Sequence, residues 1–483
     1  MRMKWIIAFV ALALLPRLGH GEDAKATLDN VAKAMGDVKS LQYTGNGAYF
    51  FFGQSVAPGA PWPRFNLKTY TRSINYDTPA MRDEFVRTQA DPAARGGGGI
   101  PLVGEQRLTQ GLSGADAWNQ AGENPPTAAI AAVADRQHQL WITPHGVIKA
   151  AIKHNATVET QTVDGKKMTV VSFAVSGQLK VKAFVNDRNL VETVESWNTN
   201  PVVGDVLTET TYADYKDFGG AQFPTKITQK QGGFPTLDLT VTDVKPNAPA
   251  DIQAPENARQ ASVKVTADKI ADGVWYLTGG THHSVLIEMS DHLVVIDGPQ
   301  DDARSAAVIA EAKKLVPNKP IKYVVNTHHH FDHAGGLGAF AADGATIITH
   351  DVNKAFLEQN LAAPRTIQPD KLAQSGKKAT VEGMQDKRVL SDGTRTVELY
   401  LIKGTPHGDG LIMAYLPKEK LLVEADVFTP APPNAAPPAQ PNPAPVNLYD
   451  NIERLNLAVD QILPMHGRKV PFAELQKAIG KSS

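Results

Sequence analysis

Hydrophobic and polar positions first follow a helical period and then an alternating one. Leu28, Val31 and Met35 share one helical face, and Gly36 ends that helix. Short alternating runs separated by turn sequences such as VDGK and NDRN follow, and they predict strands at 166–173, 179–184, 190–197, 207–215 and 236–244. A helix is expected at 128–140, and the glycine-rich loop at 94–101 is expected to be irregular. This pattern predicts an antiparallel β-rich domain over residues 22–255.

The pattern changes again near residue 263, after prolines at 246, 249 and 255 that are typical of a linker. Apolar strands now alternate with amphipathic helices, for example a helix at 303–316 and a buried strand at 321–326. Such alternation indicates a layered domain of strands and helices, which we place at 263–483. The whole chain is therefore expected to be α+β. The order of helix and meander in the first domain resembles lipoprotein-carrier-like folded sheets.

Residues 1–21 have the pattern of a secretory signal peptide. Arg2 and Lys4 precede an apolar run from Trp5 to Leu15, and the small residues Gly19 and Gly21 follow. The run is too short to span a bilayer about 30 Å thick, and no later stretch reaches about 18 apolar residues. We expect an exported protein, periplasmic or secreted, without a permanent membrane span.

Composition narrows the chemistry. Of 483 residues, 42% are hydrophobic and 20% charged, and a net charge of −1 carries no electrostatic signature of a nucleic-acid partner. The chain has no cysteine. Disulfides, thiolate metal sites and cysteine nucleophiles are thereby excluded, and any metal must be held by nitrogen and oxygen ligands.

The strongest candidate for chemistry is the segment THHHFDHAGG, which follows the buried strand at 321–326. His328, His330, Asp332 and His333 form the spacing H-x-H-x-D-H, which brings imidazole and carboxylate groups together on one loop. A solvated histidine run would lack the preceding strand, the internal Asp332 and the glycines that follow. This loop predicts a metal site that needs further ligands from elsewhere in the chain.

The further ligands are expected downstream of the loop. His407 and His466 each follow an apolar run, whereas His350 is expected to cap or line the next helix. Asp426 ends the apolar strand in LLVEADVF, where a lone carboxylate would be costly unless it were paired or metal-bound.

These residues, taken in order, resemble the five motifs of the metallo-β-lactamase superfamily over about 263–480. Asp297 in VVIDG matches the first motif, the histidine loop the second, His407 the third, Asp426 the fourth and His466 the fifth. The resemblance implies an αββα sandwich for the C-terminal domain. It also implies two metal ions, one bound by His328, His330 and His407 and the other by Asp332, His333 and His466, with Asp426 bridging them.

The same resemblance implies catalytic roles for Asp332, Asp297 and His466. Asp332 would orient a metal-bound hydroxide that attacks a carbonyl carbon, and Asp297 would orient the ligand loop. Either His466 or a second metal-bound water would assist protonation of the leaving group. Two zinc ions suit this ligand set, and iron or manganese accept it as well.

Two motifs depart from the usual pattern of the family. His407 lies in PHGD rather than before a hydroxyl residue, and Asp426 follows Glu424-Ala425 rather than glycine. The bridging position is Asp, as in glyoxalase-II-like thioesterases and lactonases, rather than the Cys or Ser of zinc β-lactamases. His330 also stands where flavodiiron proteins have Glu.

Substrate contacts are assigned to His282 and His283, on a turn near the expected site, and to Phe428. A proline-rich insertion at 429–445 begins three residues after Asp426 and is expected to be neither helix nor central strand. It would form a wall over the substrate, a partner-docking segment or a solvated spacer before a helix at about 448–461.

The sequence thus predicts an exported binuclear hydrolase that cleaves an ester, thioester, lactone or amide bond of a small molecule. Two alternatives stay open. One is a mononuclear iron oxidoreductase of persulfide-dioxygenase type. The other is a ligand-binding protein whose metal domain is accessory. No pattern assigns an oligomeric state.

Overall fold

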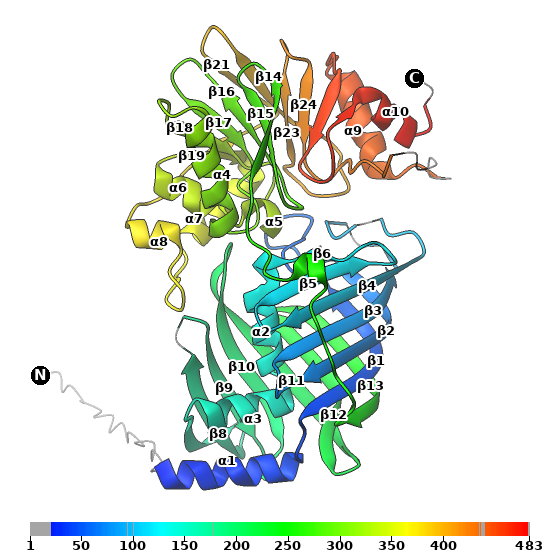
Figure 1. The fold of residues 1–483 in the computed structure, drawn as a ribbon, viewed down its shortest axis with the longest axis vertical. Helices are drawn as coiled ribbons and strands as arrows, with labels where there is room; N and C mark the ends of the chain where they lie inside the picture. The colour runs from blue at the N-terminus through cyan, green and yellow to red at the C-terminus, as the bar shows by residue number, and fades with distance from the viewer. Residues whose placement is uncertain are drawn as a thin grey trace, which may run out of the picture.

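The computed structural model describes residues 21–481, except 94, 100, 176, 434 and 436–439. The expected signal peptide therefore lies almost entirely outside the described residues. Figure 1 shows a curved N-terminal sheet at one end of the molecule and a layered C-terminal domain at the other. None of the helices in the described ranges is both long and apolar enough to cross a bilayer.

The N-terminal part is one antiparallel sheet with the spatial order β6-β5-β4-β3-β2-β1-β13-β12-β11-β10-β9-β8-β7 over the described residues. Chain neighbours pair through hairpins, and β1 meets β13, which brings the ends of the domain together. The strands are β1 (Ser40–Phe50), β2 (Arg64–Asn75), β3 (Ala80–Gln89), β4 (Glu105–Ser113), β5 (Asp116–Ala121), β6 (Thr127–Ala128), β7 (Thr157–Val163), β8 (Lys166–Val175), β9 (Leu179–Val185), β10 (Val191–Asn200), β11 (Gly204–Phe218), β12 (Ala221–Gln231) and β13 (Phe234–Pro246).

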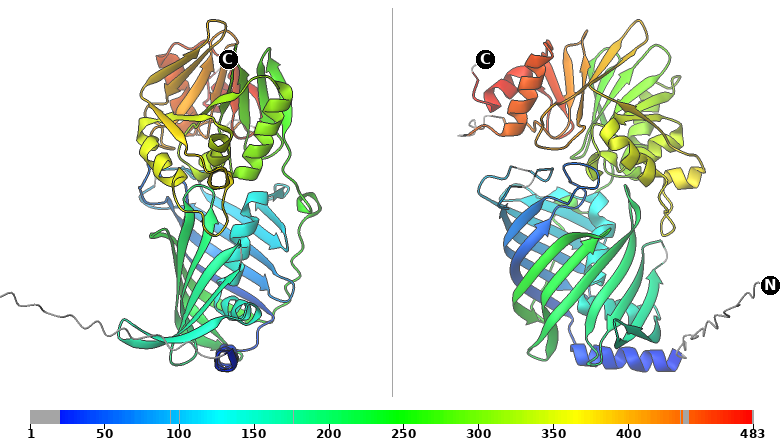
Figure 2. Two further views of the ribbon diagram at one scale, coloured as in Figure 1. Left: turned by 90° about the vertical axis from the view of Figure 1, so that its left-hand side faces the viewer. Right: turned by 180° about the vertical axis from the view of Figure 1, so that it is seen from behind.

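Alternating burial explains why these residues form a one-sided sheet. Along β9, every second residue from Leu179 to Val185 is buried, so one face packs on the core and the other faces solvent. The turn between β7 and β8 places Asp164 and Gly165 at φ 50° and 78°, the left-handed conformation that a tight hairpin requires. Helices α1 (Gly21–Met35), α2 (Val133–Trp141) and α3 (Pro144–Lys153) pack against this sheet, and Figure 2 shows α1 across one end of it.

One expectation for this region needs correction. The helix expected at 128–140 begins later, at Val133, and a second helix follows after Thr143. Pro144 occupies the first turn of α3, where its missing N–H costs nothing.

A cavity of about 980 Å³ lies between the inner face of the sheet and the C-terminal domain, which contributes residues such as Asp302 and Lys371 to its lining. Aromatic side chains such as Tyr49, Tyr70 and Phe85 form part of its wall, and Arg72 and Asp83 form another part. The carboxylate of Asp83 accepts two hydrogen bonds from Arg72, at 2.6 and 2.7 Å. The cavity thus combines an apolar wall with charged residues, of which Arg72 and Asp83 form a pair.

The C-terminal part is an αββα sandwich, as the resemblance implied. One sheet has the order β14-β15-β16-β17-β18-β19-β20 and the other β21-β22-β23-β24-β25-β26 among described residues. Their strands are β14 (Thr266–Ala271), β15 (Val274–Thr278), β16 (Ser284–Glu288), β17 (Leu293–Ile296), β18 (Ile321–Val325), β19 (Thr346–His350), β20 (Thr380–Met384), β21 (Lys387–Ser391), β22 (Thr396–Leu401), β23 (Ile412–Leu416), β24 (Leu421–Glu424), β25 (Gln461–Pro464) and β26 (Val470–Pro471).

Apolar residues of the two sheets form a shared core between them, because strands such as β17 and β24 are buried along their whole length. Helices cover the outer faces. Those on the first sheet are α4 (Asp302–Leu315), α5 (Phe331–Ala334), α6 (Leu337–Asp343), α7 (Asp351–Leu361) and α8 (Lys371–Ser375), and those on the second are α9 (Pro443–Arg454) and α10 (Phe472–Ala478). This arrangement positions the ends of the central strands at one edge of the sandwich.

The proline-rich insertion is partly helical, which corrects the expectation that it excludes a helix. Helix α9 starts at Pro443 and ends at Arg454, earlier than the expected 448–461. Asn442 caps it by accepting the Ala444 N–H at 2.9 Å, and the prolines at 443 and 445 occupy the first turn. Residues 434 and 436–439 of the insertion lie outside the described residues.

Candidate metal centre

The candidate ligands come from strand ends that meet at one edge of the sandwich. Asp297 follows β17, the histidine loop follows β18, Asp426 follows β24 and His466 follows β25. His407 lies between β22 and β23. The strands that carry these residues are apolar and buried, so the polar groups gather where the strands stop.

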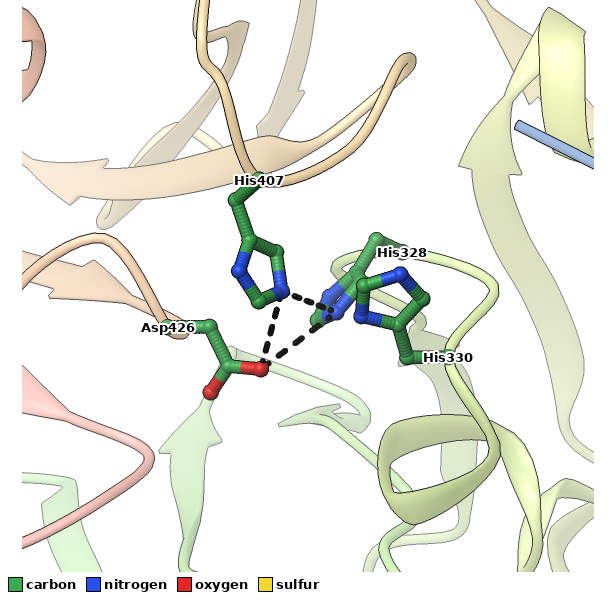
Figure 3. Close-up of side chains that lie close together, drawn as sticks. All are labelled: His328, His330, His407 and Asp426. Carbon is green, nitrogen blue, oxygen red and sulfur yellow. Dashed lines mark hydrogen bonds and ion pairs between the residues drawn. The ribbon is translucent and has the colours of Figure 1, made fainter. Parts of the chain in front are cut away.

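One group of ligand atoms contains His328, His330, His407 and Asp426 (Figure 3). The Nε2 atoms of His328 and His407 lie 3.2 Å apart. Asp426 Oδ2 lies 3.0 Å from His407 Nε2 and 3.6 Å from His328 Nε2. The three histidines are almost fully buried, with at most 6% of their surface exposed.

A second group contains Asp332, His333, Asp426 and His466. The Nε2 atoms of His333 and His466 lie 3.1 Å apart, and Asp426 Oδ1 is 3.2 Å from the first and 2.7 Å from the second. Asp332 Oδ2 completes the group at 3.5 and 3.7 Å from the same nitrogens. Asp426 therefore offers one carboxylate oxygen to each group.

The hydrogen bonds of the histidines leave the inward nitrogens free to bind a cation. His333 Nδ1 donates to Asp297 Oδ2 at 2.8 Å, and His466 Nδ1 donates to the Thr281 carbonyl at 3.1 Å. His330 Nε2 donates to the Ser55 carbonyl at 2.8 Å, and within the described ranges its buried Nδ1 has no hydrogen-bond partner. Each ring thus turns its other nitrogen toward the centre, as metal ligands require.

Burial and charge prepare these groups for metal binding. Burial lowers the pKa of His328 to about 3 and holds the pKa of His330 well below its ordinary value, so both rings are neutral at pH 7. Burial opposes ionisation of Asp426, but His333 and His466 keep the pKa of its carboxyl well below the usual range. Burial alone would lower the pKa of His333. The carboxylates of Asp426, Asp332 and Asp297 outweigh burial and hold this pKa well above its ordinary value. The centre therefore favours a bound cation.

The set of donors fits metal ions, because imidazole nitrogens and ionised carboxylate oxygens converge on two centres. Four nitrogen or oxygen donors per group match zinc, and iron or manganese accept the same donors.

Asp297 lies behind the centre and orients its ligands. It is fully buried and accepts hydrogen bonds from Thr327 N at 2.8 Å, Thr327 Oγ1 at 2.9 Å and His333 Nδ1. No described atom of Asp297 belongs to either ligand group. The structure thus places it as a positioning residue, in agreement with the role that orients the loop.

Asp426 and Asp297 both adopt left-handed backbone conformations, with φ of 64° and 62°. Such strain in a non-glycine residue concentrates at functional sites. Near Asp426 the strained turn is held by Glu424, whose Oε2 accepts the N–H groups of Val427 and Phe428 at 3.2 Å each. Burial and the Asp426 charge raise the pKa of Glu424 to about 8.

Only one of the assigned substrate contacts reaches the centre. His282 Nε2 donates to Asp332 Oδ2 at 3.1 Å. His283 turns away, because its Nε2 donates to the Gly467 carbonyl at 2.8 Å and its ring packs on Tyr276. Phe428 is 4% exposed within the core under α9, so its assignment as a substrate contact is corrected. His350 caps α7, as expected, by accepting the Val352 N–H.

No pattern in the sequence indicates that the N-terminal domain reaches this centre. Gln54 and Ser55, between β1 and β2, contact Asp332 and His330, and Gly97 lies against both Gln54 and His330. The glycine-rich loop at 94–101 is the one unusual sequence feature among these residues, and its composition does not indicate which residues it contacts.

Part of the chain is similar to a known protein family. Residues 277–464 match the family model of the metallo-beta-lactamase superfamily. A curated relative, 2,4-dinitroanisole O-demethylase subunit alpha from Nocardioides sp. (strain JS1661), is 25% identical over 185 residues, which are 37% of this chain and 51% of the relative. This chain spans about half the length of that relative.

Solved structures similar to this chain include a metallo-beta-lactamase from Pontibacter korlensis, with 19% identity over 45% of this chain and 97% of the other, at a TM-score of 0.35. The metallo-beta-lactamase FIM-1 from Pseudomonas aeruginosa is 20% identical over 45% of this chain and 93% of its own, at a TM-score of 0.34. The family match covers the motifs from Asp297 to Asp426 and ends two residues before His466, so residues 277–464 are similar to the metallo-β-lactamase superfamily.

Proposed function

We propose that this protein is a binuclear metal-dependent hydrolase that cleaves an ester, thioester, lactone or amide bond of a small molecule. The observation that carries the proposal is the division of Asp426, which gives Oδ2 to one group of ligands and Oδ1 to the other. A carboxylate held in this way suits two neighbouring cations.

Metal ions bound at these groups would lower the pKa of a water molecule and polarise the carbonyl group of a substrate. The chain itself supplies orientation. Asp332 Oδ2 is held by His282, and His466 is held through its Nδ1 by the Thr281 carbonyl. Both residues are placed to orient a nucleophile and to serve the leaving group.

The exposure of the ligand side chains indicates from which side a substrate reaches the centre. The side chains of Asp332 and His466 are 28% and 22% exposed, whereas that of His328 is fully buried. A substrate would therefore approach from the second group. The polar groups exposed there are a carboxylate and an imidazole, which suit proton transfer.

Metal content and turnover test the proposal together. Purified protein should contain about two metal ions, and chelation should abolish hydrolysis of chromogenic esters, lactones, thioesters or cephalosporins, with recovery on adding zinc. Because the curated relative is named for O-demethylation of 2,4-dinitroanisole, that compound belongs in the panel. One iron ion and no hydrolysis would instead support the mononuclear oxidoreductase.

Asp332→Ala separates catalysis from folding. It should abolish turnover while the circular dichroism spectrum and melting temperature stay close to those of the wild type. Asp460→Ala, which changes a carboxylate that is 69% exposed and pairs with Lys420, is the matched control and should keep full activity. Unchanged turnover in Asp332→Ala would contradict the proposal.

A second candidate function is ligand binding by the N-terminal sheet, which the cavity of about 980 Å³ favours because its volume suits a small molecule. In that case Asp332→Ala would leave ligand binding intact.

We also propose export to the periplasm or the medium. The apolar run between Trp5 and Leu15, with basic residues before it, supports the proposal. N-terminal sequencing of the mature protein would test it, and a retained Met1 would contradict it.

A further inference from the structure

We propose that the N-terminal sheet domain contributes residues that orient the metal ligands, and that Gln54 is the positioning residue for Asp332. The inference rests on the proposed binuclear site and goes beyond it, because the metallo-β-lactamase family match begins at residue 277. Gln54 lies 278 positions before Asp332 in the chain.

The contact starts from a loop that leaves β1 and returns to β2, and Figure 1 shows this end of the sheet beside α5. The Phe331 N–H donates to the Gly53 carbonyl at 3.2 Å, and the Asp409 N–H donates to the Val56 carbonyl at 2.6 Å. The loop therefore bonds to the backbone on both sides of the first group of ligands, once next to His330 and once two residues after His407.

Within this loop, two groups reach the metal ligands themselves. The Ser55 carbonyl accepts the His330 Nε2–H at 2.8 Å, which directs His330 Nδ1 to the centre. Gln54 Nε2 donates to Asp332 Oδ1 at 2.7 Å, and Gln54 is only 7% exposed. A buried hydrogen bond to a carboxylate is among the stronger ones in proteins.

The Gln54 amide fixes the rotation of the Asp332 carboxylate. Oδ1 is held by Gln54, so Oδ2 is the oxygen that faces His333 and His466. His282 bonds to Oδ2 from another side. Partners of this kind orient a ligand before the ion arrives, and their loss commonly weakens metal affinity by about 10–100-fold.

The glycine-rich loop holds Gln54 in place. A Cβ atom at Gly97 would overlap Gln54 Oε1 and would come within 2.9 Å of His330 Cε1, so only glycine fits there without displacement. The Gly97 N–H donates to the Gln54 carbonyl at 3.0 Å, and the Gly96 N–H donates to the Pro406 carbonyl at 3.2 Å. This loop thus links Gln54 to the segment before His407.

Aromatic packing seats the same loop. Phe331, the residue between His330 and Asp332, packs edge-on against Phe52 and Trp62, with ring centroids 5.1 and 5.9 Å away. Gly53 has φ +81°, and a Cβ there would lie 2.5 Å from the Phe331 ring. The loop is therefore anchored at the position where a shift would move two ligands at once.

Gln54→Met tests the inference, because methionine has a similar length but donates no hydrogen bond. Zinc is the probe, and its affinity is measured by competition with a chromogenic chelator on the full chain. The second zinc ion should bind about 10–100-fold more weakly, while the affinity for the first ion and the melting temperature of metal-free protein stay near wild-type values. Gln137→Met, which changes a half-buried glutamine bonded to the Gly114 carbonyl, is the matched control.

Gly97→Ala gives an independent route, since the added methyl group displaces the Gln54 amide without changing Gln54. Gly97→Ala should also weaken binding of the second zinc ion. This variant keeps the test decisive if Gln54→Met folds poorly. Equal affinity of wild type and both variants for the second ion would overturn the inference. Failure of the proposed function looks different, because the wild type would then hydrolyse nothing while Gln54→Met still lost affinity for zinc.

Discussion

Buried histidines occur in both domains, and the contrast between them shows what marks a metal site. In the N-terminal core, His138 Nε2 bonds to Ser196 Oγ at 2.8 Å and His145 Nε2 bonds to the Met35 carbonyl at 3.0 Å. In the C-terminal domain, the rings of His328 and His407 are equally hidden but turn toward each other and toward Asp426. Convergence on a shared carboxylate, and not burial, therefore distinguishes a ligand from a core residue.

The largest effect is expected from Asp426→Ala, which removes a ligand from both groups. Hydrolysis should fall by at least about 10³-fold, because both cations lose the carboxylate that holds them together. Metal analysis of the purified variant should give fewer than two ions per chain. A variant that keeps both ions and its turnover would break the contrast between the domains.

A comparison of His407→Gln with His138→Gln sharpens the contrast between a ligand histidine and a core histidine. Zinc at about 1,000 times its dissociation constant should stabilise the wild type by about 4 kcal/mol, because only the folded chain assembles the ligands. His138→Gln should keep that increment although it destabilises the metal-free protein, whereas His407→Gln should lose most of it. Thermal melts with and without zinc measure the difference, and equal increments in both variants would contradict it.

Asp297→Asn probes the support behind the ligands. Asparagine cannot accept all of the hydrogen bonds from Thr327 and His333, so we expect a loss of about 1–3 kcal/mol in the free energy of unfolding. Zinc affinity at the second group should fall by about 10–100-fold, because the His333 ring is no longer oriented. Urea unfolding and chelator competition measure the two effects, and a loss of stability with unchanged zinc affinity would assign Asp297 a purely structural role.

The last expected effect concerns acid stability of the N-terminal core. Burial lowers the pKa of His138 and of His145 to about 4, below about 6.5 in the unfolded chain. The unfolded state binds more protons in this window, so each histidine contributes stability that is complete above about pH 6.5 and is lost as the pH falls toward 4, up to roughly 3 kcal/mol. Urea unfolding of metal-free His138→Gln between pH 7 and 4 should show a shallower dependence than the wild type, and an identical slope would contradict the assignment.

Much of the metal domain could be predicted because its signals are local. The spacing H-x-H-x-D-H lies on one loop after an apolar strand, and Asp426 and His466 also follow apolar strands. The register of burial that defines those strands is visible in the sequence. Helix α9 begins earlier than the sequence predicts, because the first turn of a helix tolerates proline.

The side chains around the centre were harder to predict. His282 and His283 are adjacent, yet one contacts Asp332 and the other bonds to the Gly467 carbonyl. Phe428 is predicted as a substrate contact because it flanks the proline-rich insertion, but the turn held by Glu424 directs it into the core. The direction of a side chain in a strained turn depends on backbone angles that composition does not encode.

The sequence by itself determined the types of ligand, their order and the apolar strands that deliver them, because residue chemistry and periodicity are properties of short segments. The family resemblance already implied that Asp426 bridges two ions, but only the tertiary structure decided that Gln54 and Gly97 of the other domain lie against Asp332 and His330. Contacts between residues hundreds of positions apart depend on how two independently patterned domains pack, and no local pattern of residues carries that information.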